Sequence, residues 1–188
     1  MKKVLIIGAG RIAGLNEEDN YRAKPCSHVG AYQEHDAFEV VGICDKDKQS
    51  AQYFSRLFGI QGIYDNIPDA LAETKPDVVS IAIPYQFNID VVYSVADNPY
   101  RPSIIFCEKP IANSLKSAEL MIKVCKKNNV LFYINNRRLT PVYKEFSRLY
   151  KQVLNSSGIV TNAWCSSGLH AVGIHLIDLL RDVFGEIA

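Results

Sequence analysis

The sequence lacks any apolar run that approaches the roughly 20 residues needed to span a bilayer. It also lacks the pattern of a signal peptide, because the charged start MKKVLIIGAG reaches a glycine-rich turn after only a short apolar segment. We therefore expect a cytoplasmic protein that has no membrane as a partner.

The sequence also lacks a large net charge and closely spaced pairs of cysteines. The 188 residues include 21 Lys and Arg against 20 Asp and Glu, a net charge of +1, which argues against nucleic acid as a partner. The five cysteines form no CxxC pair, so no zinc or redox motif is indicated. No cluster of His, Cys, Asp or Glu has metal-ligand spacing, and we predict no metal site.

Short apolar runs and segments of helical spacing alternate from residue 1 to about residue 135. Runs such as KVLIIG and DVVSIAIP are apolar throughout, which is typical of strands buried on both faces. Segments such as DKQSAQYFSRLFG and SLKSAELMIKVCKKNN space their apolar residues as an amphipathic helix does. Because strands that alternate with helices pair in parallel, we predict an α/β fold with a doubly wound parallel sheet.

The pattern changes in residues 136–188. TPVYKEFSRLYKQVL predicts an amphipathic helix, GIVTNAWC a strand, and HAVGIHLIDLLRDVFG a last helix closed by Gly185. These roughly 50 residues are too few for an independent domain. We predict a short, incomplete C-terminal α+β region that takes part in substrate binding or dimerisation, since it would leave apolar surface open.

The motif GAGRIAG follows the first predicted strand directly. Gly8, Gly10 and Ala13 fit the three small-residue positions of a dinucleotide-binding loop, and Arg11 and Ile12 lie between them. A pyrophosphate would then lie at the N-terminus of the next helix, where N–H groups and the helix dipole favour negative charge. The alternative is a tight glycine turn that binds no ligand.

Asp45 ends the second predicted strand, where a carboxylate can accept hydrogen bonds from the adenosine ribose and repel a 2′-phosphate. This favours NAD, although Lys46 and Lys48 keep NADP open. Asp45 lies 35 residues after Gly10 (45 − 10), against about 20 in the usual pattern. The excess is assigned to the segment LNEEDNYRAKPCS, inserted before or within the first helix. The alternative role for Asp45 is to cap the next helix.

The stretch CEKP lies where another predicted strand ends. Ligands of parallel sheets bind beyond the carboxyl ends of the strands, so Lys109 is expected in the cofactor crevice. A lysine with a lowered pKa there could bond a substrate hydroxyl and share its proton. The alternative is a solvated lysine paired with Glu108.

Several of these motifs occur together in the order seen in a known family. GAGRIAG, the CD that ends the second strand, IAIP, CEKP and NNRR resemble the glucose–fructose oxidoreductase/inositol dehydrogenase (Gfo/Idh/MocA) family over essentially the whole chain. The resemblance implies a Rossmann-like domain at residues 1–135 and an NAD(P)-dependent oxidoreductase. It further implies hydride transfer from a secondary alcohol of a sugar, sugar nucleotide or cyclitol, and a homo-oligomer.

The resemblance also implies roles for individual residues. Lys109 matches the active-site lysine of the EKP motif, and His175 matches the histidine that contacts the reacting hydroxyl. Pro84 matches a proline beside the nicotinamide, and Glu108 of the EKP motif is grouped with the cofactor-binding residues. Asn136 and its neighbour Arg137 fall in the stretch that follows the next strand.

The sequence departs from the family pattern at Ala171, where members usually carry an aspartate four residues before the histidine. Asp178, three residues after His175 on the same helical face, could orient the histidine instead, whereas His170 points elsewhere. The substrate region is also shorter than usual. A non-catalytic dinucleotide-binding sensor or assembly protein is therefore the alternative function. We expect His28 and His35 to be surface or capping residues rather than ligands.

Overall fold

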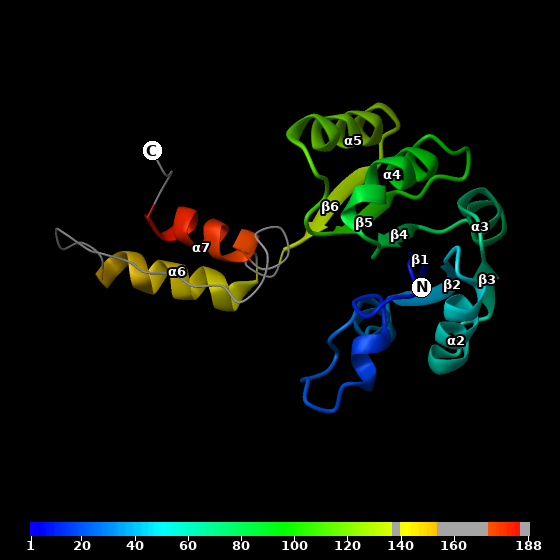
Figure 1. The fold of residues 1–188 in the computed structure, drawn as a ribbon, viewed down its shortest axis with the longest axis horizontal. Helices are drawn as coiled ribbons and strands as arrows, with labels where there is room; N and C mark the ends of the chain where they lie inside the picture. Colours follow the sequence, from blue (N-terminus) through cyan, green and yellow to red (C-terminus); the bar gives the residue numbers. More distant parts are fainter. Residues whose placement is uncertain (137–139, 154–172, 185–188) are drawn as a thin grey trace. The chain divides into compact units, whose positions relative to one another are not determined.

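The computed structural model describes residues 1–136, 140–153 and 173–184 of the chain. The chain divides into two compact units, residues 1–135 and residues 136–188 (Figure 1). The division coincides with the change of sequence pattern after residue 135.

The first unit is built on one sheet of six parallel strands in the order β3-β2-β1-β4-β5-β6. The strands are β1 (Lys2–Ile7), β2 (Phe38–Cys44), β3 (Gly62–Tyr64), β4 (Val78–Ile81), β5 (Ile104–Glu108) and β6 (Leu131–Asn135). This confirms the predicted doubly wound sheet. The strand order reverses between β1 and β4, and ligands of such sheets bind at this switch point, beyond the carboxyl ends of the strands.

Five α-helices and two 3-10 helices connect the strands. They are η1 (Leu15–Glu18), α1 (His28–Gln33), α2 (Lys48–Phe58), α3 (Ile67–Thr74), η2 (Tyr85–Phe87), α4 (Asn88–Ala96) and α5 (Leu115–Lys127). Local sequence signals set several ends: the Ser27 hydroxyl accepts from the Gly30 N–H at the start of α1. Gly59, in the left-handed region at φ 69°, ends α2.

The core lies on both faces of the sheet because the side chains of each strand alternate. Leu5 and Ile7 of β1 pack in one cluster with residues of α3, α4 and α5. Val4 and Ile6 pack in the other cluster with residues of α1 and α2. Figure 1 shows α4 and α5 beside the β4–β6 half of the sheet and α2 beside β2. Helices therefore cover both faces.

Of the four cysteines in the described residues, three are buried in the core. Burial raises the pKa of Cys44 and of Cys107 to about 12, and that of Cys125 to about 11. Among the described residues, no helix is long and apolar enough to cross a membrane.

The described part of the second unit consists of α6 (Pro141–Val153) and α7 (Ile174–Phe184). Lys151 on α6 forms an ion pair with Asp182 on α7, with 3.1 Å between Nζ and Oδ1. The rings of Tyr150 and Phe184 meet edge to face at 6.4 Å. The strand predicted over residues 158–165 and the helix-closing Gly185 lie outside the described residues.

Candidate functional site

The glycine loop begins at the end of β1 and is fixed by a close approach to β4. Gly8 has φ +102°, a conformation that residues with a side chain rarely adopt. A Cβ on Gly8 would lie 2.6 Å from the carbonyl oxygen of Ala82, just after β4. The Gly8 N–H donates to the Cys44 carbonyl at 2.9 Å, so the turn is also tied to β2. Only glycine fits this position.

Gly10 differs from Gly8, because a Cβ there would have no atom within 4 Å. Gly10 is exposed, and its backbone faces open space at the carboxyl end of the sheet. An open backbone next to a helical turn is what a bound pyrophosphate requires. The residues present therefore fit a dinucleotide, and the tight-turn alternative explains Gly8 but not Gly10.

The helix expected after the loop is interrupted. One helical turn closes with the Gly14 N–H donating to the Gly10 carbonyl at 3.2 Å, and α1 begins only at His28. Yet the His28 N–H donates to the Ile12 carbonyl at 3.1 Å and the Val29 N–H to the Ala13 carbonyl at 2.9 Å. Partners in a continuous helix are four residues apart, and these are 16 apart. The chain thus resumes the same helix after an excursion of 12 residues (16 − 4).

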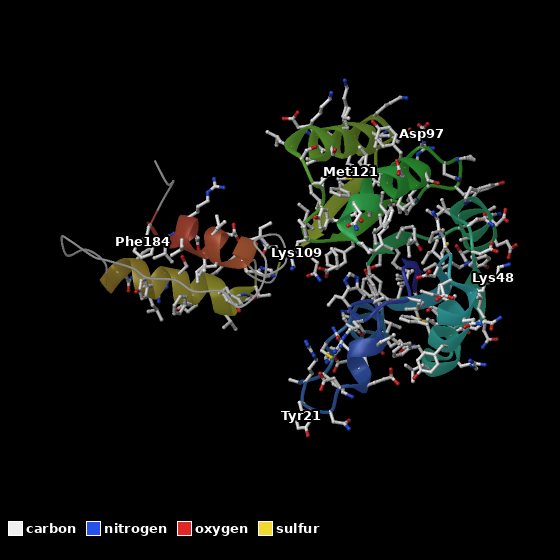
Figure 2. The ribbon with its side chains drawn as sticks, viewed as in Figure 1. Tyr21, Lys48, Asp97, Lys109, Met121 and Phe184 are labelled. Atoms are coloured by element: carbon white, nitrogen blue, oxygen red, sulfur yellow. The ribbon has the colours of Figure 1, made fainter. Side chains whose placement is uncertain are left out.

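The excursion confirms the inserted segment and places it within the first helix. Glu17 holds its two ends together: its Oε1 accepts from the Cys26 N–H at 2.8 Å and from the Ser27 hydroxyl at 2.6 Å. Figure 2 shows Tyr21 at the outer end of this segment, where its side chain is fully exposed. Arg11 donates from Nε to the Asn16 side chain at 3.3 Å, so the loop also contacts the insertion.

The close packing of the loop against α2 depends on Gly14, not only on the predicted Ala13. Ala13 is fully buried. A Cβ on Gly14 would lie 2.5 Å from ring atoms of both Phe54 and Phe58. The sequence motif contained this glycine, but its role requires the two phenylalanines of α2, which the loop sequence does not reveal.

Asp45 follows β2 and connects two parts of the site. Its Oδ2 accepts from the Ala9 N–H at 2.8 Å, and its Oδ1 accepts from the Asp47 N–H at 2.9 Å. Asp47 is the residue that caps α2, through the N–H groups of Gln49 and Ser50, so the alternative role for Asp45 is wrong. A carboxylate has about four acceptor positions, so Asp45 retains capacity for ribose hydroxyls.

Lys46 and Lys48, the two lysines that follow Asp45, have different surroundings. Lys48 forms an ion pair with Asp65, with 2.8 Å between Nζ and Oδ2. This engagement weakens the case for Lys48 as a partner of a 2′-phosphate. Lys46 is exposed.

Glu108 ends β5 and is the centre of a hydrogen-bonded group. Its Oε1 accepts from Asn135 Nδ2 at 2.6 Å and lies 2.9 Å from His28 Nε2, while its Oε2 accepts from the Lys109 N–H at 3.2 Å. Burial alone would raise the pKa of Glu108. The hydrogen bond and charge of His28, with the bonds from Asn135 and Lys109, outweigh burial and bring the pKa below its usual value. Glu108 is therefore held as a carboxylate.

His28 is buried, so the expectation of a surface or capping residue is wrong. Its side chain is 2% exposed, and that of Glu108 is 12% exposed. Its Nδ1 lies 2.6 Å from the hydroxyl of Ser80, which is itself fully buried on β4. Its Nε2 lies 2.9 Å from Glu108 Oε1, so His28 is a buried partner of this carboxylate. The alternative role of Lys109, as a solvated partner of Glu108, stays a prediction.

Lys109 follows β5 directly and is labelled in Figure 2. The Lys109–Pro110 peptide bond is cis. Pro84 lies between β4 and η2, at the carboxyl end of the neighbouring strand. The first unit thus collects the glycine loop, Asp45, Pro84, Glu108 and Lys109 at the carboxyl ends of β1, β2, β4 and β5.

His175 lies in α7 of the second unit. In the same unit, the Asn136 side chain donates to Asp178 Oδ2 at 3.3 Å. The orienting role of Asp178 and the pairing of His175 with Lys109 stay predictions. Ala171, His170 and Arg137 lie outside the described residues.

Of the residues in the Glu108 group, the sequence singled out only Glu108 and Lys109. Ser80 gave one signal, since a polar residue inside the apolar run DVVSIAIP needs a partner once buried. His28 and Asn135 gave none. Within the described ranges, no group of three or more His, Cys, Asp or Glu residues could hold a metal ion.

A parallel sheet, a glycine loop at its switch point and an acidic residue at the end of β2 define a dinucleotide-binding Rossmann protein. The sequence model of the Gfo/Idh/MocA oxidoreductase family, described by its NAD-binding Rossmann fold, matches residues 2–136. The chain belongs to this family, and NAD is the cofactor of its first unit.

Among curated relatives, D-glucoside 3-dehydrogenase of Escherichia coli (strain K12) is 26% identical over 203 residues, covering 97% of this chain and 54% of the relative. D-apiose dehydrogenase of Paraburkholderia graminis is 24% identical, with coverage of 86% and 47%. The chain thus spans about half the length of these relatives.

Solved structures share the fold. The WlbA dehydrogenase from Bordetella pertussis, in complex with NADH and UDP-GlcNAcA, has a TM-score of 0.75 at 21% identity. The alignment covers 97% of this chain and 58% of that one. An oxidoreductase from Agrobacterium radiobacter, in complex with NAD+, L-tartaric acid and magnesium, has a TM-score of 0.73 at 22% identity, with coverage of 100% and 56%.

Proposed function

We propose that this chain carries the NAD-binding and proton-handling part of an oxidoreductase. The reaction is the transfer of a hydride between the nicotinamide and a secondary alcohol of a sugar, a sugar nucleotide or a cyclitol. The observation that carries the proposal is the gathering of the glycine loop, Asp45 and the Glu108–Lys109 pair at one end of one sheet. Relatives named as sugar dehydrogenases support the substrate class.

The residues that would hold NAD are those of the loop and the strand ends. The backbone of Gly8, Gly10, Arg11, Ile12 and Ala13 would face the pyrophosphate. Asp45 would accept from the ribose hydroxyls, and Pro84 and Glu108 would lie on the nicotinamide side. When bound, NAD supplies the hydride acceptor. Lys46 leaves NADP as the second cofactor, against the repulsion that Asp45 exerts on a 2′-phosphate.

The chain's own task in the reaction is to bind the alcohol and move its proton. Lys109 Nζ would hold the substrate hydroxyl and take up its proton, with His175 as the second group at that hydroxyl. Asp178 would orient His175 from the same helix, in the role that the family usually gives to an aspartate at the position of Ala171. Lys109 and His175 come from the family pattern, whereas Asp178 is inferred from its spacing to His175 on the helix.

We also propose that residues 1–135 bind the dinucleotide, while residues 136–188 contribute to the substrate site and to a homo-oligomer in the cytoplasm. Val142, Phe146 and Leu149 on the predicted apolar face of α6 are exposed in the described part of the chain, which supports association. Light scattering tests this, since a monomeric mass at working concentration contradicts it.

The direct test of function is turnover with NAD and a panel of sugars and cyclitols, in wild type and Lys109→Ala. Loss of a positioned proton-transfer group should lower kcat by about 100-fold or more. Lys123→Ala, at an exposed lysine on α5, is the matched control and should keep wild-type turnover.

The second candidate is a non-catalytic dinucleotide-binding sensor or assembly protein. Ala171, in place of the expected aspartate, favours it. In that case wild type binds NAD but oxidises none of the panel, and Lys109→Ala behaves as wild type in every assay.

A further inference from the structure

The hydrogen-bonded group around Glu108 contains buried side chains that the proposed reaction does not use. It runs from Tyr32 of α1 through Ser80 of β4 and His28 of α1 to Glu108 of β5. The distances along it are 2.6 Å from Ser80 Oγ to His28 Nδ1 and 2.9 Å from His28 Nε2 to Glu108 Oε1. Asn135 of β6 and the Lys109 N–H complete it. Residues far apart in the sequence thus meet beside the predicted catalytic lysine.

The order Ser80–His28–Glu108 has the form of a nucleophile, a base and an orienting carboxylate. It cannot act as one, because the Ser80 side chain is fully buried on a central strand and its oxygen has no access to a substrate. The cluster therefore acts inside the protein, and it reaches the candidate site through Glu108 at the end of β5.

The donors and acceptors in the cluster assign the histidine tautomer. An ionised carboxylate has acceptors only, so the nitrogen facing Glu108 Oε1 must carry a proton. His28 Nε2 is therefore the donor to Glu108. A proton on Nε2 is present in both the neutral tautomer that donates to Glu108 and the fully protonated ring, and Nδ1 faces the Ser80 hydroxyl at 2.6 Å. Burial raises the pKa of Tyr32, and its side-chain interaction with Ser80 opposes that shift.

We propose that His28 is a positioning residue: it fixes the Glu108 carboxylate, and through it the backbone of Lys109, at the end of β5. The two oxygens of Glu108 have separate tasks. Oε1 is shared by His28 and Asn135, whereas Oε2 receives the Lys109 N–H. A carboxylate held on one side by a rigid ring cannot rotate away from the N–H on the other side. The catalytic meaning of this inference rests on the proposed function, but the geometry does not.

Two amide substitutions test whether the bond from His28 Nε2 to Glu108 matters, or only the presence of a polar side chain at position 28. In His28→Gln, the terminal amide reaches the place of Nε2 and can still donate to Glu108. In His28→Asn, the shorter amide reaches only the place of Nδ1, beside Ser80. If His28 positions Glu108, His28→Asn should lower kcat by about 10-fold or more with little change in KM for NAD, while the kcat of His28→Gln should stay within about 3-fold of wild type. Equal loss in both variants would mean a structural role and overturns the proposal.

Two readouts do not depend on turnover. In ¹⁵N-labelled wild type, the imidazole resonances report which ring nitrogen of His28 carries the proton. A protonated Nε2 is expected, and a bare Nε2 overturns the proposal even if both variants fail to fold. The amide proton of Lys109 should exchange faster in His28→Asn than in His28→Gln. If wild type turns over no substrate, the proposed function fails, while these two readouts still decide the role of His28.

Discussion

The two sides of the candidate site, at β1 and β2 and at β5, are built in different ways. At β1 and β2, the site is formed mainly by backbone. Gly8 turns the chain and the backbone at Gly10 is left open. The Asp45 side chain fixes this loop by accepting from the Ala9 N–H. At β5, side chains make it, with Glu108 held by the buried His28 and by Asn135. Backbone geometry is a local property of the sequence, whereas a buried polar cluster depends on contacts between distant segments.

Because of this difference, substitutions in the two regions should harm the protein for different physical reasons. A change in the glycine loop should act through backbone strain and ligand binding. A change in the Glu108 group should act through an unpaired buried polar group.

The largest effect is expected from Glu108→Ala. Its removal leaves two donors without their acceptor, the buried His28 Nε2–H and the Asn135 amide, at a cost of about 1–3 kcal/mol of unfolding free energy each. Glu108→Gln keeps the volume and an acceptor for His28, so it should cost clearly less. Urea unfolding of both variants measures this, and equal losses would refute the importance of the His28–Glu108 contact.

Gly8→Ala should come next. The positive φ and the 2.6 Å approach to the Ala82 oxygen together should destabilise the protein by about 2–4 kcal/mol. The matched control is Gly10→Ala, where a Cβ meets nothing. It should keep the melting temperature while weakening NAD binding by about 10-fold, since the methyl group enters the place of the pyrophosphate. A stable Gly8→Ala protein would disprove the account of the turn.

A smaller loss of about 1–3 kcal/mol is expected for Gly14→Ala, because the methyl group would overlap the rings of Phe54 and Phe58. Gly59→Ala provides the contrast: its φ of +69° is strained for alanine, but the space around it is open. Only Gly14→Ala should regain stability when Phe58 is shortened to leucine. Thermal unfolding of the single and double variants measures this coupling.

The pH dependence of stability should distinguish the Glu108 group from the loop. Because the pKa of Glu108 is lower in the folded protein than its usual value of 4.5, its ionised form stabilises the fold above pH 4.5. This contribution is lost as the pH falls through the folded pKa. The stability gap between wild type and Glu108→Gln should therefore narrow below pH 4.5. A stability difference between the two proteins that stays constant down to pH 3 would contradict the view that ionised Glu108 stabilises the fold.

The smallest effect is expected at the surface pair of Lys48 and Asp65. Both side chains are well exposed, at 72% and 42%, so water screens their attraction. Lys48→Ala should leave the melting temperature unchanged within measurement error. A clear loss there would mean that surface pairs contribute as much as the buried pair at β5.

Much of the first unit could be predicted from the sequence. Continuous apolar runs predict the strands, and the long spacing from Gly10 to Asp45 predicts the insertion. The helix ends at Ser27 and Gly59 also follow local capping rules. Each of these signals is local, because it depends on neighbouring residues and on backbone conformation.

The remainder depended on contacts that no local pattern encodes. His28 follows a capping serine, and nothing nearby indicates that it meets Ser80 and Glu108, 52 and 80 residues further on. In the same way, Gly14 is needed because of two rings on α2. Asp45 and Asp47 are two residues apart, and only the structure determines which of them caps α2.

The central claim is that the loop from Gly8 to Ala13, with Asp45, binds NAD. Calorimetric titration of the purified chain with NAD, NADH, NADP and NADPH tests it most directly. The account predicts that NAD and NADH bind more tightly than their 2′-phosphorylated counterparts, and that Gly10→Ala weakens this binding. Failure of all four to bind would contradict it, and preference for the phosphorylated pair would refute the role of Asp45.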